Sequence, residues 1–503
     1  MSFAKQHLRW IAPLAILAVA AWLRLWSLDK PGTLVFDELY YVRDAVTQLV
    51  YGYPTVWTEF GPEFSGELAR AFLDQASSIA HPPLGKWLIG LGLLFFGPES
   101  AWGWRVAVAS AGVLTVALTM RLGWLLSRSR WVAYLAGFLL ALDGVHIVLT
   151  RVALLDGFLT LFVVLGAIFV VRDWQQSAGL QGGLHWRRPW LLAAGLTFGA
   201  AAAVKWSGLY PFAAFLVLLT LGDLLRRINR ARLLRARGIV QSSWRAVLSA
   251  MRQGLATALI ALPAAALAYV ASWTGWIVNP GGQNRHEGEP WWESLWHWHV
   301  DAFAWHSTLD VQHPYQANPL GWPLGLRPTA MYSERVDGYV SAISPLPNVF
   351  ITWGGVIALL LLLWVVLGRT VFAVRGRIVS PLLGSTVAAS AFVLTGYLSG
   401  WLPWVLTPSR PAVYQFYSVV MTPFAALALA LVLVAFARFD SRVLTGTLLG
   451  RVDDQQALQS RRIAVLLLLV LTLILSLLFW PVWSGIPIPE WFYRAHRWLP
   501  GWV

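Results

Sequence analysis

The chain of 503 residues contains a succession of apolar stretches, each long enough to cross a lipid bilayer. A transmembrane helix needs about 20 consecutive, mostly apolar residues. Only 12% of the residues are charged, which is about half the fraction of a soluble domain. The sequence therefore predicts an all-α polytopic membrane protein. We expect about eleven spans, near residues 10–28, 102–126, 131–149, 153–171, 190–206, 209–225, 254–278, 349–367, 379–405, 411–437 and 463–483.

The distribution of arginine predicts the topology. The first apolar stretch resembles a signal sequence but lacks a small-residue cleavage site, so we expect it to remain as the first span. Residues 84–97 are apolar but short. If they do not cross, the basic loops all lie on the side of the N-terminus, which is the positive-inside pattern. These loops are residues 127–130, 172–189, 226–252, 368–378 and 438–462.

A crossing at residues 84–97 would instead put these basic loops outside. We therefore expect 84–97 to be a helix that lies at the outer interface. The N-terminus is then cytoplasmic and the C-terminus is outside. This topology accounts for the net charge of +14, so we expect no nucleic-acid partner.

Several classes of site are absent from the sequence. With no cysteine, the chain has no disulfide, no thiolate nucleophile and no cysteine metal site. There is no Asp-x-Asp in an outer loop, no phosphate-binding Gly-rich loop in a strand–helix context, no Gly-x-Ser-x-Gly and no regular zinc spacing. We therefore expect no metal and no cofactor. We also find no internal repeat, which argues against a transporter or flippase.

Two long outer loops, residues 29–83 and 279–348, carry most of the acidic side chains. The first contains Asp37 and Glu38 side by side. Neighbours on a helix diverge by about 100°, so one carboxylate can face a substrate while the other supports it. The alternative is that Asp37 simply caps a helix over 38–50. The second loop is rich in tryptophan, which suits either sugar and peptide stacking or interfacial anchoring.

Cationic and polar side chains at the outer ends of the spans complete a candidate site. Cations beside an acidic pair at a membrane surface suit binding of a lipid-linked phosphate while a carboxylate takes a proton. Each has a structural alternative: an interfacial lysine for Lys86, and an Asp–Arg pair between helices for Asp143 and Asp156. The candidates are Asp37 and Glu38 as catalytic groups, Lys86, Arg105, Arg151, Lys205 and Arg410 for the donor's phosphate and sugar, and His81, Asp143, Asp156, His313, Tyr315 and Tyr414 in support.

These residues lie in motifs that resemble the protein O-mannosyltransferases in their actinobacterial form. The matches follow one another along nearly the whole chain. They are Phe36-Asp37-Glu38, His81-Pro82-Pro83-Leu84-Gly85-Lys86, Arg105, Leu142-Asp143-Gly144, Arg151 with Leu154-Leu155-Asp156, Val204-Lys205-Trp206-Ser207-Gly208, His313-Pro314-Tyr315 with Trp322-Pro323-Leu324, and Leu402-Pro403-Trp404 with Arg410 and Tyr414.

The resemblance implies a single GT-C membrane domain over residues 1–503, with a catalytic first outer loop over 29–101 and a second outer loop over 279–348. It implies transfer of mannose from a polyprenyl phosphate to Ser or Thr of exported proteins, with Asp37 as the base. The Sec translocon would then be a partner that delivers the acceptor. The second outer loop, residues 279–348, is too short to contain the MIR domains of eukaryotic family members. The element His313-Pro314-Tyr315-Gln316 and the segment Leu346-Pro347-Asn348 depart from the family pattern.

A direct displacement with this arrangement inverts the anomeric centre, because one nucleophile replaces one leaving group. The phosphate leaves without much help from a general acid, whereas the acceptor hydroxyl needs a base. The alternative function is a GT-C transferase that uses a polyprenyl-phosphate sugar to modify cell-wall glycan or lipid. The HPPLGK and VKWSG elements favour the protein mannosyltransferase.

Overall fold

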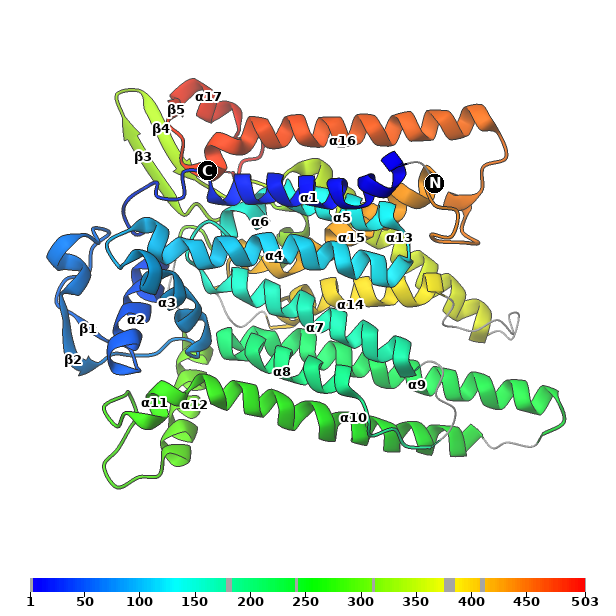
Figure 1. The fold of residues 1–503 in the computed structure, drawn as a ribbon, viewed down its shortest axis with the longest axis horizontal. Helices are drawn as coiled ribbons and strands as arrows, with labels where there is room; N and C mark the ends of the chain where they lie inside the picture. The colour runs from blue at the N-terminus through cyan, green and yellow to red at the C-terminus, as the bar shows by residue number, and fades with distance from the viewer. Residues whose placement is uncertain are drawn as a thin grey trace.

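The computed structural model describes residues 3–177, 183–239, 243–309, 313–374, 385–407 and 412–502. The long helices run side by side along one direction, and short helices and strands gather at one end of this bundle (Figure 1). The N-terminus lies at the opposite end of the bundle, and the C-terminus lies at the end with the strands. We call these the N-terminal end and the strand end.

The described residues contain long helices, short helices and two small sheets. The α-helices are α1 (Phe3–Leu25), α2 (Glu38–Tyr51), α3 (Leu84–Phe96), α4 (Ala101–Ser127), α5 (Arg130–Ala141), α6 (Gly144–Leu149), α7 (Leu155–Ser177), α8 (Pro189–Val204), α9 (Leu209–Ala236), α10 (Ser243–Ser272), α11 (Thr274–Val278), α12 (Trp291–Thr308), α13 (Val349–Val374), α14 (Ser385–Leu406), α15 (Thr422–Phe436), α16 (Gln455–Ser484) and α17 (Glu490–Ala495). The 3-10 helices are η1 (Gly66–Arg70), η2 (Trp206–Gly208), η3 (Pro319–Leu324), η4 (Gln415–Met421) and η5 (Leu448–Gly450).

Within the described ranges, eight helices are long and apolar enough to cross a membrane: α4, α7, α9, α10, α13, α14, α15 and α16. The shorter apolar helices α1, α5 and α8 fall on three further expected spans. The expected span over 131–149 is divided into two helices, because α5 ends at Ala141 and α6 begins after Asp143. The Asp143 side chain caps α6 by accepting a hydrogen bond from the His146 N–H at 2.8 Å. The chain is therefore a multi-pass membrane protein, and the total of about eleven spans stays a prediction.

The short helix α3 does not traverse the bundle. Helix α1 ends and α4 begins at the strand end, and α3 lies there beside α2 (Figure 1). Its 13 residues would span about 20 Å at 1.5 Å per residue, less than the roughly 30 Å of a bilayer core. This arrangement agrees with the expectation from the arginine distribution that residues 84–97 stay on one side.

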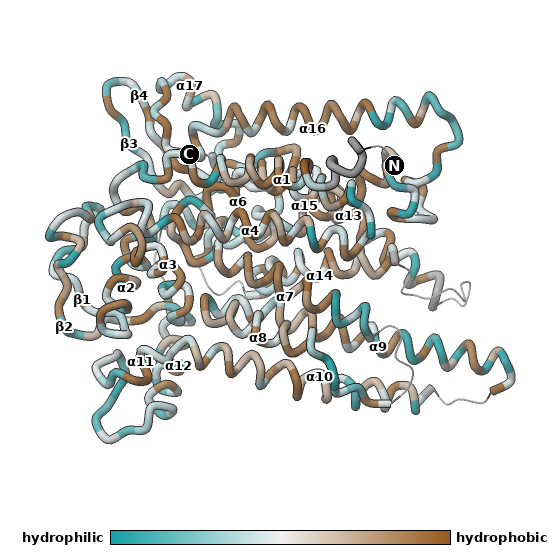
Figure 2. The backbone as a smooth tube through the Cα atoms, in the orientation of Figure 1, coloured by the Kyte–Doolittle hydropathy of each residue, from teal (hydrophilic) through white to brown (hydrophobic). Residues whose placement is uncertain are grey.

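Burial separates a central group of helices from a peripheral one. The most apolar window of η4 and α15 is 89% buried, and that of α7 is 72% buried. The corresponding windows of α10, α13 and α16 are 28% to 33% buried, so most of their apolar surface faces outward. Figure 2 shows hydrophobic residues along the middle of the bundle and hydrophilic ones toward its two ends. An apolar outer surface of this kind is what lipid contact requires.

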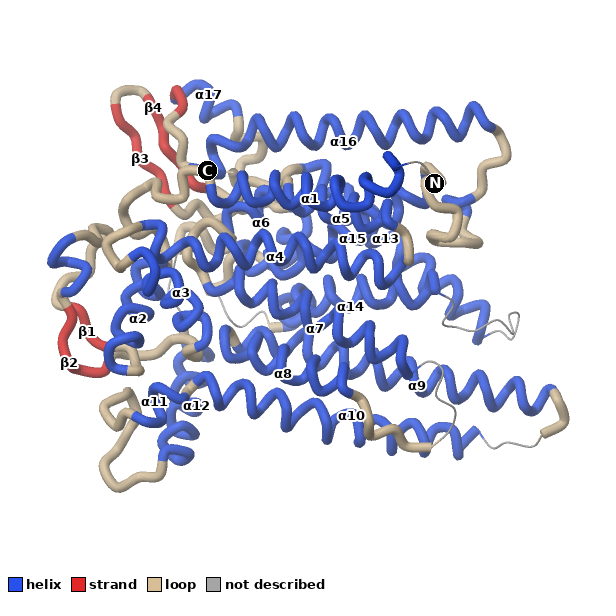
Figure 3. The backbone as a smooth tube through the Cα atoms, in the orientation of Figure 1, coloured by secondary structure: helices blue, strands red, loops and turns tan. Residues whose placement is uncertain are grey.

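The strands of the described residues lie at the strand end of the bundle (Figure 3). Strands β1 (Thr55–Trp57) and β2 (Phe72–Ala76) form an antiparallel pair in the first long loop. Strands β3 (Tyr332–Val336) and β4 (Tyr339–Ile343) form a hairpin, and β5 (Ile488–Pro489) adds to β4 with Tyr339 opposite Pro489. The two long loops thus fold over the same end of the bundle, and the candidate residues lie beneath them.

Candidate active site

Asp37 lies directly before α2, but its carboxylate is not used to cap the helix. It occupies the cap position, but its side chain makes no cap hydrogen bond. Instead Asp37 Oδ2 accepts a hydrogen bond from the Tyr41 hydroxyl at 3.4 Å, one helical turn away. The preceding Phe36 has φ +50°, which is strained for a bulky side chain. Asp37 therefore has the position of a helix cap without its hydrogen bond, contrary to the capping alternative. The backbone directly before this carboxylate is strained.

Glu38, the neighbouring carboxylate, is fully buried and locked in place. Its Oε1 accepts from Arg105 Nε and from the Ala153 N–H, and its Oε2 accepts from Arg105 Nη2 and the Val35 N–H, at 2.8 to 2.9 Å. All four bonds are directed at the charged form, so the carboxylate is well compensated. With both oxygens occupied, Glu38 has the contacts expected of the carboxylate that supports its neighbour, and its place among the catalytic groups stays a prediction.

Arg105, expected at the donor's phosphate, is buried and bonded to the protein. Its side chain is 2% exposed. Besides Glu38, it donates from Nη1 to the carbonyls of Leu28 and Pro31 and from Nη2 to the carbonyl of Thr33. A guanidinium has five N–H donors, and these contacts use all five. Arg105 therefore fastens the loop between α1 and α2, which holds Asp37 in place.

Lys205 and Asp156 form a buried ion pair that faces Asp37. Lys205 Nζ lies 3.0 and 3.1 Å from the two carboxylate oxygens of Asp156, at the start of α7. The same ammonium lies 4.1 Å from the centre of the Tyr417 ring. A narrow cavity beside the pair is lined by Asp156, Ser207, Tyr210, Trp404 and Tyr417. Asp156 thus does form a structural pair between helices, but its partner is this lysine rather than an arginine.

The surroundings of Asp37 raise its pKa to about 6 from the ordinary 3.8. Burial is the main cause, because it disfavours the charged carboxylate. Asp156 adds to the increase, whereas Lys205 and the Tyr41 hydroxyl oppose it. Asp37 is therefore ionised at neutral pH and is a stronger base than an ordinary aspartate, as a general base requires.

Lys86 of α3 is buried and paired with an acid. It is fully buried, donates to the His81 carbonyl at 2.9 Å and pairs with Asp44 of α2 at 3.2 Å. Burial raises the pKa of Asp44 and lowers the pKa of Lys86, and their mutual attraction opposes both shifts. Lys86 therefore ties α3 to α2, and its contact with the donor's phosphate stays a prediction.

Arg151 and Asp143 serve the packing of helix ends. Arg151 donates from Nη1 and Nη2 to the carbonyls of Leu23, Arg24, Trp26 and Ser27, at the end of α1. These contacts satisfy acceptors that a helix end leaves unpaired. Asp143 caps α6 and interacts electrostatically with Arg24, without an ion pair at contact distance among the described residues. Arg151 is 4% exposed in this position, and its contact with the donor's phosphate stays a prediction.

The aromatic candidates surround Asp37 from the second loop and from η4. His313 lies edge-on to Phe36 and to Tyr414, with ring centres 6.4 and 5.4 Å apart, and its Nδ1 accepts from the Tyr315 N–H. His81 lies 6.1 Å from the Tyr41 ring and stacks on His306 of α12 at 5.4 Å. His81, His313, Tyr315 and Tyr414 are thereby placed around the Asp37 region. Arg410 lies outside the described residues.

Several side chains at the site were not anticipated. Tyr41 follows Asp37 by four residues, a spacing that puts two side chains on one helix face, so it could have been found. Asp44, Tyr417 and His306 come from separate elements, and only the fold brings them in. In α12, Trp298 is buried whereas Trp292 and Trp296 are 58% and 68% exposed. Among the residues that the structure describes, no group of three or more His, Asp or Glu side chains is arranged to hold a metal ion.

Comparison with known proteins identifies the family of this arrangement. Residues 14–279 match the family model described as dolichyl-phosphate-mannose-protein mannosyltransferase, and residues 291–502 match the C-terminal four-TMM region of protein-O-mannosyltransferase. The polyprenol-phosphate-mannose–protein mannosyltransferase of Mycobacterium tuberculosis is 30% identical over 96% of this chain and 89% of its own length. That of Corynebacterium glutamicum is 28% identical over 95% and 90%.

Solved structures support the same fold. The S. cerevisiae protein O-mannosyltransferase Pmt1-Pmt2 complex bound to the sugar donor matches with a TM-score of 0.69 at 13% identity, covering 98% of this chain and 92% of that one. The archaeal oligosaccharyltransferase AglB from Archaeoglobus fulgidus matches with a TM-score of 0.51 at 14% identity, over 98% and 58%. The expected GT-C fold is thereby confirmed. The chain belongs to the dolichyl-phosphate-mannose-protein mannosyltransferase family.

Proposed function

We propose that this protein transfers mannose from polyprenyl-phosphate mannose to Ser or Thr hydroxyls of exported proteins, at the outer face of a bacterial plasma membrane. The full-length similarity to the mycobacterial and corynebacterial enzymes supports the lipid-linked mannose donor and the protein acceptor. The arginine distribution supports a cytoplasmic N-terminal end and an outer strand end. The acceptor reaches that end from the Sec translocon as an unfolded chain.

One observation carries the mechanism: among the described residues, the Asp37 side chain accepts one long hydrogen bond, whereas that of Glu38 accepts four. Asp37 takes the proton of the acceptor hydroxyl. The hydroxyl oxygen forms a bond to the anomeric carbon as the bond from that carbon to the phosphate oxygen breaks. The electron pair leaves with the phosphate. Because the nucleophile attacks opposite the leaving group, a β-linked donor gives an α-linked product.

The leaving phosphate needs positive charge, which Lys205 supplies. An ammonium has three N–H donors, and its pairing with Asp156 leaves capacity for a phosphate oxygen. From the sequence alone, we keep Arg410 as a further candidate for this phosphate. The aromatic side chains of Tyr210, Trp404 and Tyr417 lie beside this pair. No metal takes part.

Residues 29–101 supply the catalytic loop in this scheme, and residues 279–348 form much of the wall that meets the acceptor. His313, Tyr315 and Tyr414 lie around Phe36, where an extended peptide can reach Asp37. The exposed Trp292 and Trp296 of α12 either stack on peptide and sugar or anchor the loop at the interface.

The test uses purified protein, radiolabelled polyprenyl-phosphate mannose and a Ser/Thr-rich peptide. Label should enter this peptide and not a matched peptide with Ala at every Ser and Thr. Label that enters a glycan or lipid acceptor instead would establish the alternative transferase. Activity should survive EDTA, and loss of activity that Mg²⁺ or Mn²⁺ restores would overturn the metal-free mechanism.

A further inference from the structure

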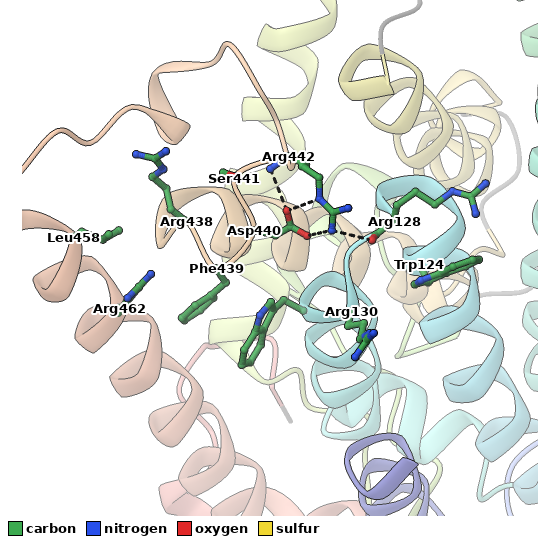
Figure 4. A pocket seen from close by; sticks show the side chains of 11 residues that line it. Trp124, Arg128, Arg130, Arg438, Phe439, Asp440, Ser441, Arg442, Leu458 and Arg462 are labelled. Atoms are coloured by element: carbon green, nitrogen blue, oxygen red, sulfur yellow. Dashed lines mark hydrogen bonds and ion pairs between the residues drawn. The ribbon is translucent and has the colours of Figure 1, made fainter. Parts of the chain in front are cut away.

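A cavity of about 840 Å³ lies at the N-terminal end of the bundle, remote from Asp37. The end of α4, the start of α5, the segment after α15 and the first turns of α16 line it (Figure 4). Its charged lining consists of five arginines and one acid: Arg128, Arg130, Arg438, Arg442, Arg462 and Asp440. None of these side chains has a part in the proposed transfer reaction.

The single acid is already neutralised by one arginine. Asp440 accepts from Arg442 Nε at 3.0 Å, from Arg442 Nη2 at 2.8 Å and from the Arg442 N–H at 3.1 Å. Figure 4 shows this pair at the edge of the cavity. The other four arginines therefore keep a charge of +4 without an acid in contact among the described residues.

Most N–H donors of these four arginines are unused by the protein. Arg130 is exposed and has no hydrogen-bond or ion-pair partner within the described ranges. Arg462 donates once, to the Ala437 carbonyl at 3.3 Å, and Arg438 donates once, to the Val452 carbonyl at 2.9 Å. Arg128 reaches Gln175 at 3.3 Å. Since each guanidinium has five donors, the cavity offers a concentration of donors that suits phosphate oxygens.

The backbone brings two of these arginines to the cavity at some cost. Arg128 and Arg438 follow α4 and α15 with φ of +56° and +48°. Glycine or asparagine usually takes the left-handed conformation after a helix, because a longer side chain is strained there. Positive charge at helix ends and the positive-inside rule account for basic residues on this side of the protein. They do not require several of them to converge on one cavity.

The cavity adjoins a surface that faces lipid. Directly beyond Arg462, α16 exposes Ile463, Leu466 and Leu467 by 49% to 60%. On the α5 side Trp131 is 50% exposed and stacks on Phe439 with ring centres 5.1 Å apart. Tryptophan with basic side chains is typical of the level of lipid headgroups. An anion here would thus have apolar helix surface for attached acyl chains.

We propose that this cavity binds the phosphate headgroup of an anionic phospholipid from the inner leaflet, with the acyl chains along α16. Basic pockets between transmembrane helices on the cytoplasmic side bind such headgroups in general. The continuity with exposed apolar side chains favours a lipid over a free phosphate. The binding is independent of the transfer reaction at the other end of the molecule.

The test measures phosphatidylglycerol bound to the full-length protein in phosphatidylcholine nanodiscs, by native mass spectrometry. The variant R130Q/R462Q removes the two arginines with the fewest protein contacts. The control R230Q/R232Q removes two exposed arginines of α9, at the same end but outside the cavity. We expect the first variant to bind phosphatidylglycerol about tenfold or more weakly and the control to stay within about twofold of the wild type.

If both variants lost phosphatidylglycerol binding equally, the proposed site would be overturned, because the lipid would then respond only to the overall positive charge of this end. Displacement of phosphatidylglycerol by soluble glycerol 3-phosphate at matched concentration would overturn the lipid as the occupant. Unchanged thermal unfolding in pure phosphatidylcholine shows that the variant is folded. If it is not, R130Q alone answers the question, because Arg130 contacts no described partner. The variant R130K/R462K should restore binding by keeping the charge.

Discussion

The two ends of this bundle handle positive charge in opposite ways. At the strand end, Lys86, Arg105 and Lys205 are each at most 6% exposed, and each has its own carboxylate: Asp44, Glu38 and Asp156. At the N-terminal end, four arginines around one cavity keep their charge uncompensated by any acid of the described chain, and Arg130 and Arg462 are exposed. A buried charge must be paired, whereas an exposed charge at the membrane surface can stay available.

This difference changes what a cation implies about function. At the strand end, three of the four described cations that were expected to bind a phosphate connect helices and loops through their protein contacts. The fourth is Lys205, which lies with Tyr417 and Asp156 near Asp37. In the proposed mechanism the two adjacent carboxylates therefore have different tasks: Asp37 acts as the base, and Glu38 with Arg105 forms the scaffold that holds it.

The largest effect is expected for Asp37→Asn. The substitution keeps the size of the side chain and its contact with Tyr41 but removes the base, so kcat should fall about 10²–10⁴-fold. The transfer assay with labelled donor measures this directly. The control Glu59→Gln, an exposed acid of the same loop, should leave the rate near that of the wild type. A fully active Asp37→Asn protein would remove Asp37 as the base.

A loss of stability is expected for Arg105→Gln, because it leaves the Glu38 charge buried with only two N–H donors. Breaking a buried pair in this way typically costs about 3–5 kcal/mol. The matched control is Arg70→Gln at the same end, where Arg70 and Glu99 are 72% and 47% exposed, and here the cost should be less than about 1 kcal/mol. Denaturation midpoints in mixed detergent compare the two. Similar midpoint shifts for Arg105→Gln and Arg70→Gln would show that the Glu38–Arg105 pair does not stabilise the fold more than an exposed pair does.

The sequence predicted features that follow from one-dimensional patterns. Apolar stretches indicated the spans, and the arginine distribution indicated that residues 84–97 stay at one end. It could not predict the partners of the buried charges. Arg105 follows Glu38 by 67 positions and Lys205 follows Asp156 by 49. Only the packing of α2 on α4, and of α7 on α8, therefore decides which charges meet. In the sequence, a basic residue at the end of a span looks the same whether its side chain binds a phosphate or, as for Arg151, the carbonyls at a helix end.

The pH dependence of the transfer rate offers a further test of the division between the two carboxylates. With the pKa of Asp37 at about 6, the base is protonated at lower pH, so kcat/KM should fall tenfold per pH unit below about 6 and level off above it. Tyr41→Phe removes a hydrogen bond that lowers this pKa, so the midpoint should move to higher pH. A profile that is flat from pH 5 to 8 would contradict Asp37 as the titrating base.

The smallest effect is expected at the other end of the molecule. In zwitterionic detergent without anionic lipid, R130Q/R462Q should change the free energy of unfolding by no more than about 0.5 kcal/mol, because neither arginine supports a buried group. The transfer rate should stay within about twofold, since α4 and α16 separate this cavity from Asp37 by their length. A loss of several kcal/mol would mean that these arginines hold the bundle together as Arg105 does. Uncompensated charge at this end would then be structural, and the contrast between the two ends would disappear.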